Sequence, residues 1–176
     1  NYTNIATAAL PAPTPQQQLD QANADVQPLI TAFTNATTKA ARQAAITTAG
    51  NPDSITKLTR LNTTYLAIAG NTGPKAPNSL VLDLAIANAN LLIQNEDLLA
   101  ATNTNRQELI NSTASKITTF QTINDQLKNG TTTAEIAART AAGTLYNTNY
   151  LQQSSVSTLN NTLARAQQDQ DTYTEA

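Results

Sequence analysis

The chain has 176 residues, a length typical of a single domain, and a formal net charge of −2 at pH 7. It contains no Cys and no His, which excludes disulfide bonds, zinc sites built from thiolate or imidazole, and the nucleophile–base pairs that use either residue. The ten Lys and Arg residues are scattered along the chain, so the basic stripe of a nucleic-acid-binding protein is missing and we expect no nucleic-acid partner.

The polar residues are mostly uncharged. Asn, Gln and Thr supply 65 of the 176 residues, whereas Asp, Glu, Lys and Arg together supply 22. A surface of amide and hydroxyl groups gives weak long-range electrostatics and little steering of charged partners. Ala supplies another 30 residues, so we expect a thin core in which helices approach one another closely.

The N-terminal segment over 1–15 contains three alternating Pro residues, which block helix formation and favour an extended backbone. We expect it to be a flexible lead-in, followed by a single helical domain over 16–176. The first helix is predicted to begin near Thr14 and Pro15, since proline is accepted in the first turn, and to run to Ala49. Pro28 lies inside it and should kink or split it near Val26, because proline removes a backbone hydrogen bond.

A second helix start follows at once. Asn51 is a good N-cap, Pro52 suits the first helical position, and Asp53 suits the positive end of the helix dipole. This helix is predicted to end at Gly70, because the stretch over 70–78 contains two Gly and two Pro residues and reads as a loop.

The densest run of large aliphatic residues extends from Ser79 to Ala101. Its apolar residues fall on every face of a helix, which is typical of a helix surrounded by others, so we expect it to be the central helix. The alternation at its start also fits a strand, but Ala and Leu dominate over β-branched residues and favour helix. The run is long enough to cross a bilayer, but its charged and amide residues argue against a transmembrane segment.

The remaining helices are separated by polar turns. Residues 102–105 form one possible break, with capping-box spacing between Asn105 and Glu108, although one helix over 79–129 is the alternative. Thr132 and Glu135 form a second capping box, from which the last helix is predicted to run towards residue 172. The sequence therefore predicts an all-α fold, an elongated antiparallel bundle of four or five helices.

The central helix supplies most candidate site residues. Its large aliphatic side chains are candidates to line an apolar cavity or an interface: Leu80, Leu84, Ile86, Leu91 and Ile93. Asp83 is interpreted as an acid near the helix N-terminus or as a polar handle at the mouth of such a cavity. Asn88 and Asn90, if buried, must be hydrogen-bonded, and either fix the helix register or hold the polar head of a ligand. The adjacent acids Glu96 and Asp97 point about 100° apart and are expected on a solvated helix face.

Six Asn residues lie in the glycosylation pattern Asn-x-Ser/Thr, about as many as the abundance of Asn, Ser and Thr gives by chance. Asn129, beside a Gly at a predicted helix end, is the best candidate acceptor among them. Glycosylation would apply only to a chain that is secreted by a eukaryote.

These features favour a non-catalytic module, secreted or at the cell surface, that binds a surface or a protein partner or associates with itself. The alternative is a carrier of a lipid or another apolar small molecule in a cavity between helices. No cluster of reactive side chains indicates an enzyme, and no motif indicates a cofactor or a metal.

Overall fold

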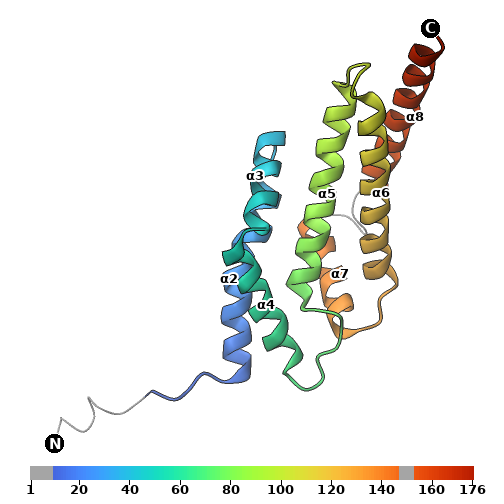
Figure 1. Cartoon of the computed structure of the whole chain (residues 1–176). Helices are drawn as coiled ribbons and strands as arrows, with labels where there is room; N and C mark the ends of the chain where they lie inside the picture. Colours follow the sequence, from blue (N-terminus) through green and yellow to red (C-terminus); the bar gives the residue numbers. More distant parts are fainter. Residues whose placement is uncertain (1–9, 147–152) are drawn as a thin grey trace, which may run out of the picture.

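The structure of the chain, a computed structural model, describes residues 10–146 and 153–176. The described residues form seven helices and no strand, which confirms the all-α prediction and corrects the predicted number of four or five helices. Figure 1 shows their arrangement. The helices are α2 (Pro15–Asn35), α3 (Lys39–Ala49), α4 (Pro52–Leu66), α5 (Pro77–Leu99), α6 (Arg106–Asn129), α7 (Thr133–Tyr146) and α8 (Gln153–Glu175).

The predicted first helix is two helices, but the break does not lie at Pro28. Helix α2 continues through Pro28 to Asn35. Pro28 is exposed, and so is Ala24, whose carbonyl group loses its usual backbone partner, while the buried side chains on either side of Pro28 hold α2 on the core. The chain turns instead at 36–38, and the Thr38 side chain caps α3 by accepting a hydrogen bond from the backbone N–H of Ala41.

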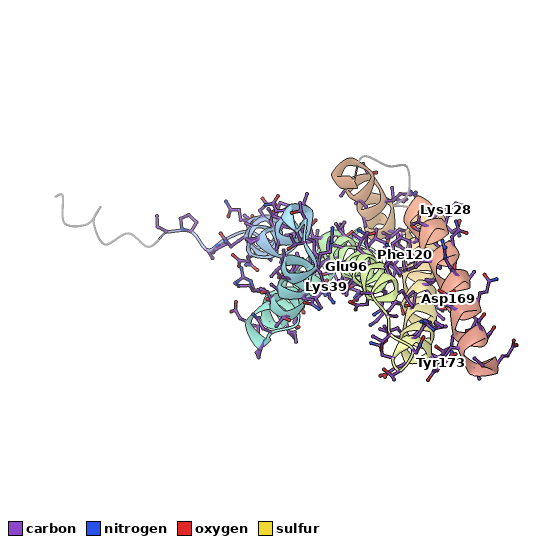
Figure 2. The ribbon with its side chains drawn as sticks, turned by 90° about the horizontal axis from the view of Figure 1, so that it is seen from above. Lys39, Glu96, Phe120, Lys128, Asp169 and Tyr173 are labelled. Carbon is purple, nitrogen blue, oxygen red and sulfur yellow. The ribbon has the colours of Figure 1, made fainter. Side chains whose placement is uncertain are left out.

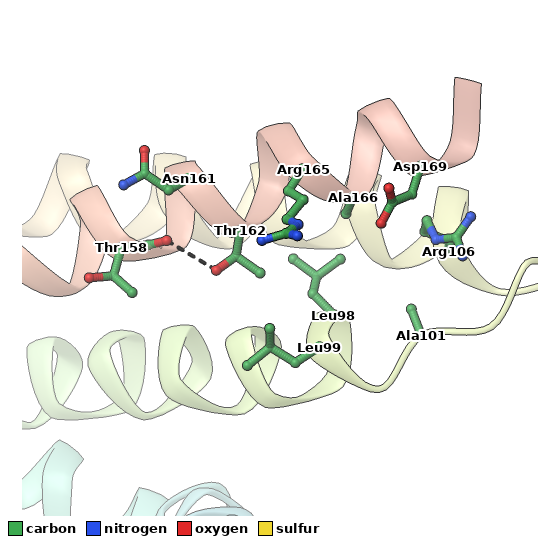
Figure 3. A pocket seen from close by; sticks show the side chains of 10 residues that line it. All are labelled: Leu98, Leu99, Ala101, Arg106, Thr158, Asn161, Thr162, Arg165, Ala166 and Asp169. Atoms are coloured by element: carbon green, nitrogen blue, oxygen red, sulfur yellow. Dashed lines mark hydrogen bonds between the residues drawn. The ribbon is translucent and has the colours of Figure 1, made fainter. Parts of the chain in front are cut away.

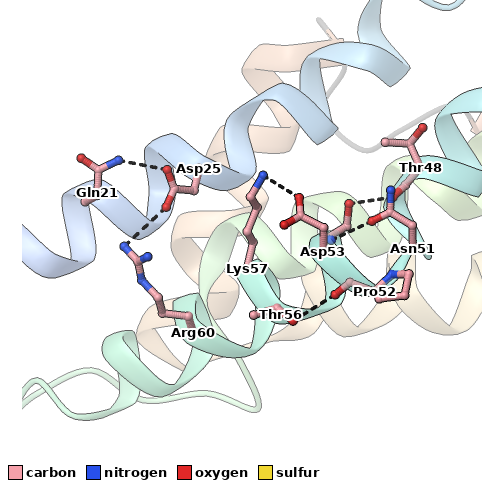
Figure 4. Close-up of polar contacts among 10 residues, drawn as sticks. Gln21, Asp25, Thr48, Asn51, Pro52, Asp53, Thr56, Lys57 and Arg60 are labelled. Carbon is pink, nitrogen blue, oxygen red and sulfur yellow. Dashed lines mark hydrogen bonds and ion pairs between the residues drawn. The ribbon is translucent and has the colours of Figure 1, made fainter.

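Helix α4 begins as predicted. The Asn51 side chain accepts a hydrogen bond of 2.8 Å from the backbone N–H of Ser54, and Pro52 is the first helical residue (Figure 4). The helix ends at Leu66 and not at Gly70. On its surface, Arg60 lies 3.4 Å from Asp25 of α2, an ion pair that links the two helices.

The stretch over 79–129 contains two helices, separated at 100–105. Helix α5 starts earlier than predicted, with Ala76 as N-cap and Pro77 as first residue. The capping box at the start of α6 is not formed, because the Asn105 side chain accepts from the backbone N–H of Thr102, which precedes the helix.

The last predicted helix corresponds to two helices in the structure, α7 and α8. Its predicted path crosses residues 147–152, which lie outside the described residues, as do residues 1–9 of the predicted lead-in. The capping box at its start is formed: the Thr132 hydroxyl accepts from the backbone N–H of Glu135, whose carboxylate accepts from the N–H of Thr132. The Arg139 side chain donates to three carbonyl groups at the end of α6, namely those of Leu127, Lys128 and Gly130.

Helix α5 lies at the centre of the described structure. It contacts each of the other six helices, with α2, α3 and α4 on one side and α6, α7 and α8 on the other (Figures 1 and 2). Its buried residues face in all directions and include Leu80, Val81, Leu82, Leu84, Ala85, Leu91 and Ile93. This arrangement confirms that the most apolar stretch of the sequence is the helix around which the others pack.

One end of the bundle is held by a polar junction. The hydroxyl of Thr133 accepts from the backbone N–H of Thr72 at 2.7 Å and lies 3.0 Å from the hydroxyl of Tyr65. Gly73 approaches α7 closely here: a Cβ atom on it would lie 2.5 Å from that of Ala134. The junction ties the loop after α4 to the start of α7.

Candidate functional site

The structure places the predicted lining residues of α5 in the core. Leu80, Leu84, Leu91 and Ile93 are buried, and Ile86 is half-buried and packs against the buried cluster. None of these five side chains lines either of the two hollows described below.

Asp83 is not in the first turn of α5, because the helix begins at Pro77. Its carboxylate forms an ion pair with Lys75 of the preceding loop, and its side chain is about one-third exposed. The charge therefore has a partner within the chain, and the ion pair holds the loop against the start of α5.

The buried amides do not fulfil the expectation that each is hydrogen-bonded. Asn88 is 6% exposed, and its Oδ1 has no partner among the described residues. The same holds for Oδ1 of Asn124, a buried residue of α6. Asn90 is half-buried. A buried carbonyl oxygen without a donor costs free energy, so these amides do not contribute a register-fixing hydrogen bond through Oδ1.

The adjacent acids on α5 have different surroundings. Glu96 is exposed, as expected, whereas Asp97 forms an ion pair with Lys39 of α3. This hydrogen bond from Lys39 to Asp97 raises the pKa of the Lys39 ammonium group above its ordinary value. The pair connects α3 to α5.

Asn129, the candidate glycosylation acceptor, is the exposed last residue of α6.

Asn62, which lies in another of the six glycosylation patterns, joins two helices through its side chain. Its Oδ1 accepts hydrogen bonds from the backbone N–H of Ala76 at 2.9 Å and from the hydroxyl of Ser79 at 2.7 Å. Asn62 thereby connects α4 to the start of α5.

One hollow is a groove between the end of α5, the start of α6 and helix α8, with a volume of about 460 Å³ (Figure 3). We call it the α5/α8 groove. The turn over 100–105 brings Arg106 to one end of it, and α8 runs along its length. Its lining residues are Leu98, Leu99, Ala101, Arg106, Thr158, Asn161, Thr162, Arg165, Ala166 and Asp169.

The two long walls of the groove differ in polarity. The α5 wall is apolar, and its Leu99 side chain is 72% exposed, more than any other large apolar residue among the helical residues whose burial the structure describes. The α8 wall carries Thr158, Thr162, Arg165 and Asp169, whose spacing places them along one face of the helix. Figure 3 shows the Arg165 side chain extending from α8 towards α5.

The charged groups of the groove are held to different degrees. The guanidinium of Arg106 donates to the side-chain oxygens of Asn103 at 2.8 Å and of Gln170 at 3.3 Å. Arg165 forms no hydrogen bond or ion pair with any described residue, and neither does the side chain of Asp169. Two guanidinium groups thus face one carboxylate, a local excess of positive charge on a chain whose net charge is negative.

A second hollow lies on the outer face of α2, with a volume of about 620 Å³, and it carries no charged group. It involves a single helix, and its residues are Ala24, Gln27, Pro28, Thr31, Ala32 and Asn35. It lacks a second wall, whereas the α5/α8 groove is formed by three helices.

Sequence reasoning missed the groove residues. Leu99 and Arg106 flank the polar turn over 102–105, and a large apolar residue at the very end of the central helix was a usable signal. The position of Arg165 opposite Leu99 had no sequence signal, because it depends on how α8 packs against α5.

The described residues contain no group of three or more acidic side chains close enough to hold a metal ion. Among the described helices, none is both long and apolar enough to cross a membrane. Comparison with protein-family models, with curated proteins and with solved structures finds no match to this chain.

Proposed function

We propose that the protein is a non-catalytic binding module, secreted or displayed at a cell surface, that attaches to an apolar surface or partner through the α5/α8 groove. The observation that carries the proposal is the exposed Leu99 side chain on the apolar wall of a groove formed by three helices. Binding sites are commonly concave and largely apolar, with a few polar groups that orient the ligand.

Composition supports the non-catalytic part of the proposal. The chain has neither His nor Cys, so the side chains that most often act as general base or nucleophile are missing. The uncharged amide and hydroxyl surface gives the rest of the molecule little attraction for charged partners. On such a surface, a groove with an exposed leucine on its apolar wall is a distinct place for attachment.

The carrier alternative has less support. It requires the aliphatic residues of α5 to line a space for a ligand, whereas Leu80, Leu84 and Leu91 pack in the core and line neither described hollow.

Adsorption to defined surfaces tests the proposal. The purified protein is passed over alkyl-terminated and hydroxyl-terminated monolayers on a quartz-crystal microbalance, and its oligomeric state is measured by light scattering. We expect preferential adsorption to the alkyl surface, reduced in the variant Leu99→Ser. Burial of one Leu side chain contributes about 1.5–3 kcal/mol, so the affinity should fall by at least tenfold.

The matched control is Ile55→Ser, because Ile55 of α4 is also an exposed aliphatic residue, at 53%, but lines neither described hollow. It should adsorb like the wild type. A monomeric protein with equal affinity for both surfaces, or an equal loss in the two variants, would overturn the proposal.

A further inference from the structure

Arg165 is the feature of the α5/α8 groove that the proposed function does not use. Its guanidinium group has no hydrogen-bond or ion-pair partner among the described residues, although it extends towards the apolar wall of α5. A guanidinium group presents several N–H donors in a planar fork that matches the two oxygens of a carboxylate or sulfonate.

The surrounding groups define where an anion would lie. Asp169 is one turn further along α8, on the Arg106 side of the groove, and repels an anion from that end. On the other side of Arg165 lie Thr162 and then Thr158, whose side chain is directed towards α5 with its oxygen turned away from Arg165 (Figure 3). An anion is therefore favoured at Arg165, on the side away from Asp169, with the guanidinium as its donor, because the Thr162 hydroxyl already donates to Asn95 and to the Thr158 carbonyl.

The apolar wall lies opposite this position. Leu98 and Leu99 of α5 face the groove, and Ala166 of α8 adds a small apolar contact. The volume of about 460 Å³ lies within the range of about 300–1,000 Å³ that is usual for small-molecule sites. A ligand that pairs with Arg165 has space to lay an apolar body on Leu99.

We propose that the α5/α8 groove binds a small amphipathic anion, with its carboxylate or sulfonate on Arg165 and its apolar body on Leu98 and Leu99. This inference rests on the proposed function, because it names the ligand class of the same groove. It adds a dependence on charge that attachment to an apolar surface does not require.

Two dyes that share one skeleton test this inference. The anionic probe is 1-anilinonaphthalene-8-sulfonate, and N-phenyl-1-naphthylamine is the same skeleton without the sulfonate. Each is titrated into the ¹⁵N-labelled protein, with binding followed by fluorescence and by amide chemical shifts. We expect saturable binding of one anionic dye per chain, with shifts confined to residues 98–106 and 158–169, and weaker binding of the neutral dye.

Substitutions separate the contribution of charge. Arg165→Gln should weaken binding of the anionic dye about tenfold and leave the neutral dye unchanged, because it removes one charge-assisted hydrogen-bonding group. Asp169→Asn should strengthen binding of the anionic dye, because it removes the repelling carboxylate. Arg42→Gln on α3 is the matched control, since the Arg42 side chain also lacks a partner among the described residues and lines neither described hollow; it should change neither affinity.

Each contrary outcome has a separate meaning. If both dyes shift the groove residues equally and Arg165→Gln has no effect, the anion inference is wrong and the proposed function survives. If neither dye binds while adsorption to the alkyl surface depends on Leu99, the groove accepts surfaces and not small anions. Shifts located elsewhere on the chain would also overturn the inference.

Discussion

At the scale of single residues, Asn62 is one of the side chains that position the central helix. Its Oδ1 satisfies both the backbone N–H of Ala76 and the hydroxyl of Ser79, two buried residues at the start of α5. A buried donor without an acceptor loses the hydrogen bond that it makes to water in the unfolded chain. Asn62 therefore contributes to stability through groups that belong to another helix.

We predict that Asn62→Ala lowers the free energy of unfolding by about 1–3 kcal/mol, because it leaves these two donors without an acceptor. Urea denaturation followed by circular dichroism measures this change. Asn111→Ala is the matched control: Asn111 is exposed and accepts only from a neighbouring Gln on the same helix, so its loss should cost less than about 0.5 kcal/mol. Equal effects would mean that the interhelical contact is not a source of stability.

Gly73 provides a second test at this scale. Its φ is +138°, which disfavours any side chain, and an added Cβ would lie 2.5 Å from that of Ala134. Gly70 also has a positive φ, +90°, but an added Cβ there meets nothing within 4 Å.

Gly73→Ala should therefore destabilise the protein more than Gly70→Ala, by about 2–4 kcal/mol against about 1 kcal/mol, because only Gly73 combines backbone strain with a clash. Thermal or urea unfolding of the two variants measures the difference. If Gly70→Ala were the more costly, the close approach of the loop to α7 would be wrong.

Residue-level signals predicted some helix starts and not others. Asn51 and Thr132 cap their helices as their spacing indicates. The same reasoning failed for Asn105, whose side chain bonds back to Thr102, and for α5, which was expected from Ser79 but begins at Pro77. Asn and Ser have several backbone groups within reach, and the tertiary structure decides which of them they use.

At the scale of elements, the start of α7 carries a group sensitive to pH. Hydrogen bonds from the side chain and backbone of Thr132 to the Glu135 carboxylate lower its pKa below the ordinary 4.5. A carboxyl group whose pKa is lower in the folded chain stabilises the fold above its unfolded pKa. This contribution is lost as the pH falls from above 4.5 through the lowered pKa.

We predict that Glu135→Gln loses less stability than the wild type when the pH is lowered from 7 to 3. The difference should be below about 1 kcal/mol, because the carboxylate is partly exposed and its interactions are screened by water. Urea unfolding at the two pH values measures it. Glu108→Gln, at the start of α6 where no capping box forms, should keep the acid dependence of the wild type; an identical response of both variants would contradict the role of Glu135.

Breaks between helices were harder to predict than the helices. Pro28 is the strongest helix-breaking residue in α2, yet α2 passes through it and ends at Asn35. The chain then turns at 36–38 before α3 begins at Lys39. Packing of Val26, Leu29 and Ile30 on the core outweighs the lost hydrogen bond at an exposed position. Local propensity gives the penalty, but only the packed structure shows what offsets it.

At the scale of the whole molecule, the central position of α5 could be predicted because its apolar residues cover every face of the helix. The apolar pattern does not show which helix covers which face, so neither the pairing of α5 with α8 nor the groove between them was predicted. The candidate lining residues were chosen for their apolar character, and that same character places them in the core.

The distinction between core and groove on α5 is measurable. Leu84 is fully buried, and its replacement by Ala should cost about 2–5 kcal/mol, because it removes apolar contacts and leaves a cavity. Leu99→Ala should change stability by less than about 0.5 kcal/mol, because the side chain is mostly exposed. Urea unfolding of both variants checks this; a large loss for Leu99→Ala would place Leu99 in the core and remove it from the proposed binding surface.

Hydrogen exchange on the bound protein is the most direct test of attachment through the α5/α8 groove. Exchange is measured by mass spectrometry for the free protein and for the protein bound to alkyl-coated particles. The proposal predicts added protection confined to residues 98–109 and 156–170, with the middle of α5 equally protected in both states. Protection centred on α4, or loss of protection throughout α5 on binding, would contradict it.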